Sequence, residues 1–281
     1  MRIPILDLAI IVGYIIAILS IGILSTRKQR VTGQVFFLAG RSLPWGIVGA
    51  ALFASNISTI HLVGLTASGY NDGLVWGNFE WMAAFTLILL SLVFAPFHFR
   101  SRLSTLPEFL ERRYSPACRS FLAFMAIVAA LFIHIGMSIY AGAAVFQQFF
   151  GISVVASILI VSIVVSIYTV LGELKAVVVT ETFNTGFLLL GACIITVSAL
   201  RALPQHGIHT LAQFVAATKP DQLHMLQWHS PVGLNWYAVF LGYPILGVWY
   251  WCTDQTIVQR VLGARSERDA QLGPLLAWVF R

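Results

Sequence analysis

A run of polar side chains interrupts an apolar stretch at residues 46–64. The centre of this stretch reads Ser-Asn-Ile-Ser-Thr over residues 55–59, and His61 follows. Hydrocarbon cannot hydrogen-bond such groups, so they must face protein, water or a ligand. Flanking glycines weaken the helix, and a helix that opens near Ser55 and Asn56 would free backbone carbonyls to hold a small hard cation. The alternative is that these small, hydroxylated residues only pack neighbouring helices together.

A carboxylate and an indole ring adjoin one another in the next apolar stretch, where the sequence reads Asn-Phe-Glu-Trp-Met. Glu80 is costly inside a membrane unless it is paired or hydrated. A carboxylate accepts hydrogen bonds from two hydroxyl groups while an indole offers a flat apolar face, so Glu80 and Trp81 together suit a sugar. Alternatively, Glu80 lies at the membrane interface beside a tryptophan of the aromatic belt.

Three successive aromatic residues, Trp249, Tyr250 and Trp251, precede a polar Thr-Asp-Gln sequence. Tyr250 or Trp251 could stack on a ligand ring and act as a lid. An ion pair with a basic loop residue is the simpler explanation for the polar residues that follow, Asp254 and Gln255.

Glu181 stands at the start of a further apolar stretch, within Val-Thr-Glu-Thr-Phe-Asn. A carboxylate at this place is expected either to serve the pathway of a cation on the inner side of the membrane or to be a hydrated acid at a helix end.

The elements that must position these residues are apolar helices. Hydrophobic residues make up 58% of the chain and charged residues 10%, whereas soluble domains carry about 25% charged residues. The composition therefore predicts an all-α integral membrane protein. Spans of the length that a bilayer requires are expected at 5–24, 45–68, 76–97, 119–147, 152–171, 175–200 and 235–258, and a last one begins near Gln271 and stops at Arg281.

Basic residues lie mostly on one side of these spans, in the connections that follow the first, third, fifth and seventh. Cytoplasmic loops are rich in lysine and arginine. The pattern therefore predicts a multi-pass membrane protein with its amino terminus outside and its basic loops in the cytoplasm. We expect its location to be the plasma membrane. Topology explains the net charge of +6, and we expect no nucleic-acid partner.

Two connections carry helical patterns of their own. The amphipathic stretch 101–120 predicts a short surface helix that begins after Thr105, and the outer loop 201–235 contains a possible helix at 211–217. The chain has no G-x-S-x-G, H-E-x-x-H or P-loop motif, so the sequence predicts neither an enzyme nor an ATP-driven pump.

Several segments, taken in order, carry a resemblance to a known family. They are Phe-Phe-Leu-Ala-Gly-Arg-Ser-Leu-Pro-Trp at 36–45, Ala-Ser-Asn-Ile-Ser at 54–58, Phe-Glu-Trp-Met at 79–82, Thr-Leu-Pro-Glu-Phe-Leu-Glu-Arg-Arg-Tyr at 105–114 and Trp-Tyr-Trp-Cys-Thr-Asp-Gln at 249–255. Together they resemble the N-terminal half of the sodium:solute symporter family, in its sodium–sugar cotransporter branch.

The resemblance implies a fold and a set of site residues. The fold is the leucine-transporter-like inverted repeat, with a leading span at 5–24, a first repeat at about 45–200 and the start of a second repeat at 236–281, all within one transmembrane domain. Backbone carbonyls of Ala54 and Ile57 would hold sodium. Sugar contacts would fall on His61, Glu80 and Arg281, and the inner gate on Tyr250 beside Trp251.

The resemblance also implies a function, namely a sodium-coupled secondary active symporter that moves a sugar or polyol by alternating access, with sodium as coupling ion and no other cofactor. A sodium symporter of another small solute, such as an inositol, a carboxylate or an amino acid, remains an alternative. So do a solute sensor that does not transport and an inactive truncated half-transporter, since the chain stops inside an apolar stretch.

Overall fold

Helices make up most of the residues that the structure, a computed structural model, describes, namely 5–26 and 33–280. In this part of the chain no strand forms, and backbone bridges are limited to the isolated pairs Leu43–Ala264 and Gln227–Asn235. The prediction of an all-α chain is therefore confirmed.

The expected membrane spans correspond to apolar helices of differing length. Within the described residues, three helical runs are long and apolar enough to cross a membrane, and the pair Trp45–Asn56 and Ile60–Asp72, bent by 61°, would be a fourth. The three long runs are Leu74–Arg100, Pro116–Phe150 and Leu174–His206. Shorter apolar helices lie inside the other expected spans, at Ala9–Gly22, Val154–Ile167 and Ala238–Thr253.

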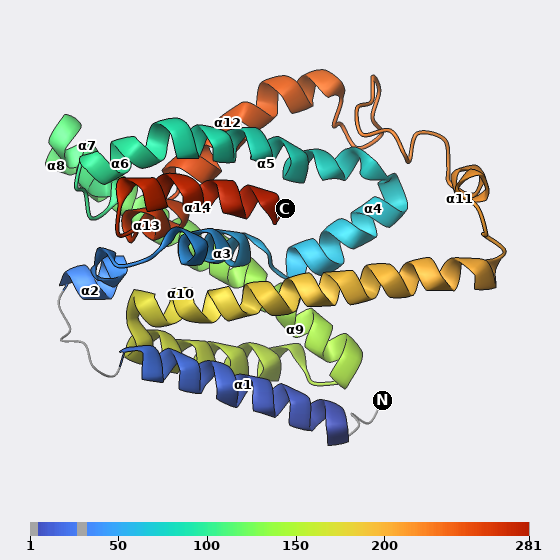
Figure 1. The fold of residues 1–281 in the computed structure, drawn as a ribbon, viewed down its shortest axis with the longest axis horizontal. Coiled ribbons are helices and arrows are strands. Elements are labelled where there is room, and N and C mark those ends of the chain that lie inside the picture. Colours follow the sequence, from blue (N-terminus) through green and yellow to red (C-terminus); the bar gives the residue numbers. More distant parts are fainter. Residues whose placement is uncertain (1–4, 27–32, 281) are drawn as a thin grey trace.

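One layer of the molecule consists of long helices that pack side by side (Figure 1). The leading helix α1 (Ile5–Thr26) lies along α10 (Val154–Ala202), where the Tyr14 hydroxyl donates to Asn184 Oδ1. Figure 1 shows α10 doubling back on itself, so that its two arms run beside one another. The helices α8 (Pro116–Ala129), η5 (Ala130–Ile135) and α9 (Gly136–Phe150) precede it.

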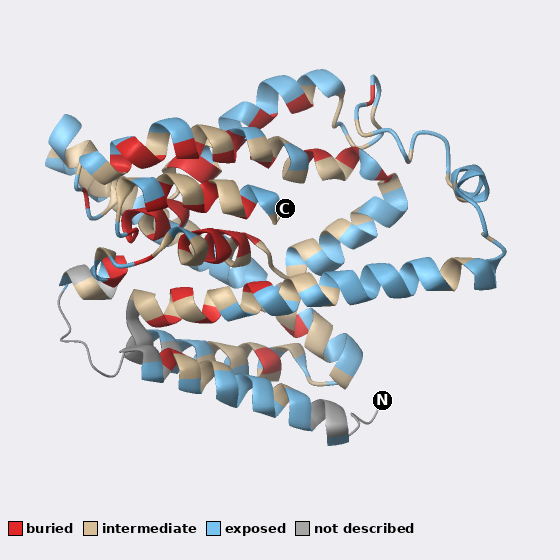
Figure 2. Ribbon diagram, in the orientation of Figure 1, coloured by how far each residue is buried: buried red, intermediate tan, exposed pale blue. Residues whose placement is uncertain are grey.

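The buried core lies in the other layer, and Figure 2 shows buried residues gathered there. It is formed by α3 (Trp45–Asn56), α5 (Asn78–Leu89), η4 (Leu90–Phe94), α6 (Ala95–Arg100), α13 (Gln255–Leu262) and α14 (Glu267–Val279). Helices α3 and α14 cross closely because glycines meet: a Cβ on Gly49 would lie 2.7 Å from the Gly273 carbonyl oxygen.

Helix α14 begins earlier than the sequence predicted, at Glu267 and not near Gln271. The Ser266 side chain accepts a hydrogen bond from the Asp269 amide and caps the helix. The first turn of α14 contains the charged residues Glu267 and Asp269. The apolar pattern of the sequence therefore does not indicate where this helix begins.

The short connecting helices form as predicted, although one is held differently. Helix α7 (Leu106–Arg113) follows Thr105, but the Thr105 side chain makes no capping bond; the Leu106 amide donates instead to Gln255 Oε1 at 2.8 Å. Burial raises the pKa of Glu108, but bonds from the Ser104 amide and Arg112 outweigh it and hold the pKa below its ordinary value. Helix α11 (Leu211–Ala217) begins with a capping box.

A backbone clamp fixes the start of α3. The Leu43 amide donates to the Gly263 carbonyl at 3.1 Å, and the Arg265 amide donates to the Leu43 carbonyl at 3.0 Å. The Trp45 amide donates to Asp269 Oδ1 at 2.9 Å. The clamp joins the start of the first predicted repeat to the connection between α13 and α14.

Candidate functional site

The polar stretch identified in the sequence is a break between two helices. Helix α3 ends at Asn56, Ile57 and Ser58 are not helical, and the chain resumes as η2 (Ile60–Leu65) and α4 (Thr66–Asp72). The opening was expected near Ser55 and Asn56 and lies about two residues later. The prediction of an interrupted helix is therefore confirmed, with a shifted position.

Two backbone carbonyls at this break lose their usual helical donors. In an unbroken helix the Ser58 amide would donate to the Ala54 carbonyl, but it donates to His61 Nδ1 at 3.3 Å. The His61 amide would likewise donate to the Ile57 carbonyl, but it donates to the Ser58 carbonyl at 2.9 Å. These two carbonyls sit at the negative end of the α3 dipole, where a cation is favoured. The predicted sodium ligands thus have the chemistry that such an ion requires.

The structure brings together two of the predicted solute contacts. His61 Nε2, on η2, lies 3.6 Å from Glu80 Oε1, on α5, and the side chains are 24% and 23% exposed. The same His61 ring accepts from the Ser58 amide through Nδ1, so it connects the break to Glu80. A neutral imidazole with this Nδ1 acceptor has its proton on Nε2 and can donate toward the carboxylate. The pair presents both a hydrogen-bond donor and acceptors to a polyhydroxylated ligand.

The other predicted solute contacts lie apart from this pair. Trp81 is 70% exposed, because neighbouring residues on a helix point in different directions and Glu80 takes the inner one. Arg281 lies outside the described residues. The combination of Glu80 with His61 therefore has a geometric basis that the combination of Glu80 with Trp81 lacks.

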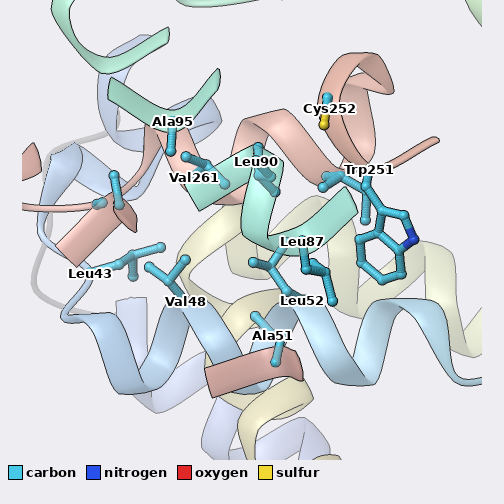
Figure 3. Close-up of a cluster of buried hydrophobic side chains, with 14 of the residues drawn as sticks. Leu43, Val48, Ala51, Leu52, Leu87, Leu90, Ala95, Trp251, Cys252 and Val261 are labelled. Atoms are coloured by element: carbon cyan, nitrogen blue, oxygen red, sulfur yellow. The ribbon is translucent and has the colours of Figure 1, made fainter. Parts of the chain in front are cut away.

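The predicted gate residues lie on a second interrupted helix, η8 (Val248–Thr253), which ends at the extended residue Asp254. The Tyr250 and Trp251 rings meet edge to face, with centroids 5.2 Å apart. Trp251 is 2% exposed and belongs to the buried cluster that contains Leu52 and Leu87 (Figure 3). Tyr250 is only half-buried, so of the two rings it keeps more solvent-accessible surface.

Glu181, predicted to lie on a cation pathway, has a cationic partner. Its Oε2 accepts from Arg260 Nε at 3.0 Å, its Oε1 accepts from Arg260 Nη2, and Oε1 also accepts from the Ser55 hydroxyl at 3.0 Å. Ser55 is next to Ala54, so this ion pair joins α10 and α13 to the end of α3. Arg260 was expected only as a basic residue of a cytoplasmic connection. Arg260 lies on α13 (Gln255–Leu262), a helix of eight residues that packs against the core. The positive-inside rule does not predict this packing.

In a comparison with protein families, residues 36–280 match the model of the sodium:solute symporter family. Among curated proteins, the chain is 33% identical to sodium/glucose cotransporter 1 of Oryctolagus cuniculus, covering 96% of the chain and 44% of the relative. It is also 33% identical to sodium/myo-inositol cotransporter 2 of Mus musculus, covering 96% and 42%. The chain thus spans less than half the length of these relatives.

Among solved structures, the chain is similar to a Na⁺-coupled sialic acid symporter in a substrate-bound, outward-open state. The TM-score is 0.80 at 20% identity, over 98% of this chain and 57% of the other. This likeness shows the fold, which is the predicted leucine-transporter-like inverted repeat, comprising the first repeat and the start of the second.

Proposed function

Because the chain belongs to the sodium:solute symporter family, we propose that it takes part in sodium-coupled symport of a sugar or polyol into the cell by alternating access. The members of this family are multi-pass membrane proteins. We further propose the plasma membrane as its location, with the amino terminus outside, the basic loops in the cytoplasm and the bilayer as its surroundings. Its proposed layout is the predicted one, with a first repeat at about 45–200 and a second that starts at 236.

The observation that carries the proposal is the loss of helical donors at the Ala54 and Ile57 carbonyls. Sodium bound there would hold the break in one geometry and, through Ser58, would order the His61 ring beside Glu80. Solute would then bind more tightly to the sodium-bound state, and coupling is this difference in affinity between states. A membrane potential of 100 mV adds about 2.3 kcal/mol for each sodium ion.

A polyhydroxylated neutral solute suits the site better than an anion. Glu80 accepts hydrogen bonds from hydroxyl groups, whereas its negative charge at 23% exposure repels a carboxylate. Two of the relatives named above are described as cotransporters of glucose and of myo-inositol, which supports the same class. An inositol is therefore the second candidate. Tyr250, half-buried and at a helix break, is the proposed gate, and Glu181 remains the proposed element of the cation pathway.

The test is uptake by the complete gene product in lipid vesicles, with sodium replaced by potassium and a panel of sugars and inositols as competitors. Glu80→Ala is expected to reduce sodium-dependent uptake to background while the protein still inserts. Glu111→Ala is the matched control, because Glu111 forms only an exposed ion pair with Arg119, and it should retain uptake within about twofold. Normal uptake by Glu80→Ala would remove Glu80 from the site.

The two alternative functions that involve no transport, a solute sensor and an inactive half-transporter, would give different results. A sensor would bind solute in a sodium-dependent manner in equilibrium dialysis but show no accumulation inside vesicles. An inactive half-transporter would show neither, and a complete gene product that ends where this chain ends would identify it.

A further inference from the structure

A buried histidine outside the candidate site contacts the backbone of the gate helix. His98, on α6, is 3% exposed, and its Nε2 lies 3.0 Å from the carbonyl oxygen of Cys252 on η8. Because a carbonyl only accepts, Nε2 carries the proton and donates. Phe94 and Phe97 surround the ring, with centroids 6.0 Å and 5.7 Å from it. Among the described residues, its Nδ1 has no hydrogen-bond partner.

The Cys252 carbonyl needs this partner because the gate helix ends there. The Thr256 amide, which would donate to Cys252 in an unbroken helix, donates to Asp254 Oδ1 at 2.8 Å. Asp254 is extended, with φ −71° and ψ 132°, so the helix does not continue. A buried carbonyl without a donor is costly. His98 supplies that donor from a different span.

We propose that His98 is a positioning residue for the gate segment 248–253: its hydrogen bond to the Cys252 carbonyl holds the end of the segment that carries Tyr250 and Trp251. The role of this segment as a gate rests on the proposed function, whereas the hydrogen bond between His98 and Cys252 does not. Trp251 and Cys252 are both buried beside this anchor, at 2% and 0% exposure. Release of the carbonyl would let η8 lengthen, unwind or tilt, because the bond from the Cys252 thiol to the Thr86 carbonyl, at 3.7 Å, is weak.

Cys252 is a native reporter of this anchor. Its thiol is buried and lies 3.7 Å from the Thr86 carbonyl, so a maleimide reaches it only when the segment opens. The test uses the complete gene product in vesicles and measures the rate of maleimide labelling of the Cys252 peptide by mass spectrometry. Cys118, which is half-buried, serves as the internal reference for global unfolding.

Two substitutions separate the hydrogen bond from the packing of the ring. His98→Phe keeps an aromatic ring but removes the donor, and it is expected to label Cys252 about three- to tenfold faster. His98→Gln places an amide nitrogen about as far from the backbone as Nε2, and it should restore labelling to within about twofold of the unaltered protein. If His98→Phe does not fold, His98→Asn replaces it, because its shorter amide cannot reach Cys252.

Ser91→Ala is the matched control. Ser91, on the same span, is 1% exposed and donates to the Gln271 carbonyl at 2.7 Å, so it makes the same kind of bond but to α14. It should leave Cys252 labelling unchanged. Equal rates for His98→Phe and the unaltered protein, failure of His98→Gln to restore the rate, or acceleration by Ser91→Ala would each overturn the inference.

A separate arm tests the gate role. Sodium with a transported sugar should change the Cys252 labelling rate of the unaltered protein. If labelling is insensitive to these ligands while His98→Phe still accelerates it, the anchor stands and the proposed gate fails.

Discussion

The carbonyls of Ala54, Ile57 and Cys252 share one situation, since in each case the amide four residues later donates elsewhere. The first two remain available to an ion at the break after α3, whereas His98 occupies the third. A side chain is thus the partner at one helix break, and a cation is the proposed partner at the other. The sequence indicated the break after α3 through its polar residues, but it did not indicate the break at Asp254, which lies inside one predicted span. It could not indicate which acceptor each amide finds, because that depends on how neighbouring helices pack.

The ion pair of Glu181 and Arg260 gives a prediction at the residue scale. The side chains are 15% and 8% exposed, so removing one charge leaves the other buried. Glu181→Gln or Arg260→Gln alone is expected to lower the free energy of unfolding by about 3–5 kcal/mol, and the double variant by less than the sum. Denaturant unfolding of the complete gene product in mixed micelles measures these values.

The exposed pair Glu111–Arg119 provides the matched double-mutant cycle. Each single substitution in this pair should lower the free energy of unfolding by less than about 1 kcal/mol. Additive losses at Glu181 and Arg260 would show that their pairing contributes nothing.

Helices α3 and α14 are held at a distance that only glycine permits. A Cβ on Gly49 would lie 2.7 Å from the Gly273 carbonyl oxygen, and one on Gly273 would lie 2.5 Å from Val48 Cγ1. Small residues allow helix backbones to approach in membranes, where lipid removes most of the hydrophobic drive for association. The start of α3 is thereby held against the first turns of α14, and Phe53, toward the polar end of α3, meets Phe280.

This close crossing gives a prediction at the element scale. Gly49→Ala is expected to destabilise the protein by about 1–3 kcal/mol, since backbone and a Leu276 Cβ at 2.8 Å must move. Gly46→Ala, in the same helix with nothing within 4 Å, should be neutral or stabilise by about 0.5–1 kcal/mol. Thermal unfolding followed by size-exclusion chromatography compares them. Equal melting temperatures for the two variants would show that the close approach of α3 and α14 does not require glycine at position 49.

Element boundaries show where sequence patterns succeed and fail. Apolar length located the spans, and the turn chemistry of Thr210 and Gln213 agrees with the predicted helix at 211–217. The start of α14 was missed because its capped first turn is charged. The pairing of Arg260 with Glu181 was missed because the two residues lie 79 positions apart, and nothing local in the sequence relates them.

At the scale of the whole molecule, many apolar residues of α1, α8, α9 and α10 are exposed, and pale blue marks exposed residues along these helices in Figure 2. In a family of multi-pass membrane proteins, such surfaces are covered by lipid or by further helices. The fold was predictable because the apolar spans and the family segments agree along nearly the whole chain. The identity of the solute was not, because a carboxylate beside an imidazole suits many polyhydroxylated solutes.

The proposed orientation gives a prediction at this scale. In a Cys118→Ala background, Gln205→Cys in the outer loop should react with an impermeant thiol reagent on intact cells, whereas Ser104→Cys should react only after permeabilisation. Both positions are exposed, so accessibility depends on the side of the membrane alone. Reaction of Ser104→Cys on intact cells would reverse the assigned topology.

The bridge between Leu43 and Ala264 joins residues that are roughly 220 positions apart. A ribosome that adds 5–20 residues per second needs roughly 10–45 s to make the intervening chain. During that interval α3 enters the bilayer with the backbone before its first turn unsecured, and only the arrival of residues 263–265 supplies the partners of Leu43. Biogenesis therefore includes a waiting period in which the insertion machinery must shelter the start of this span, and a pause in translation before residue 263 would prolong it.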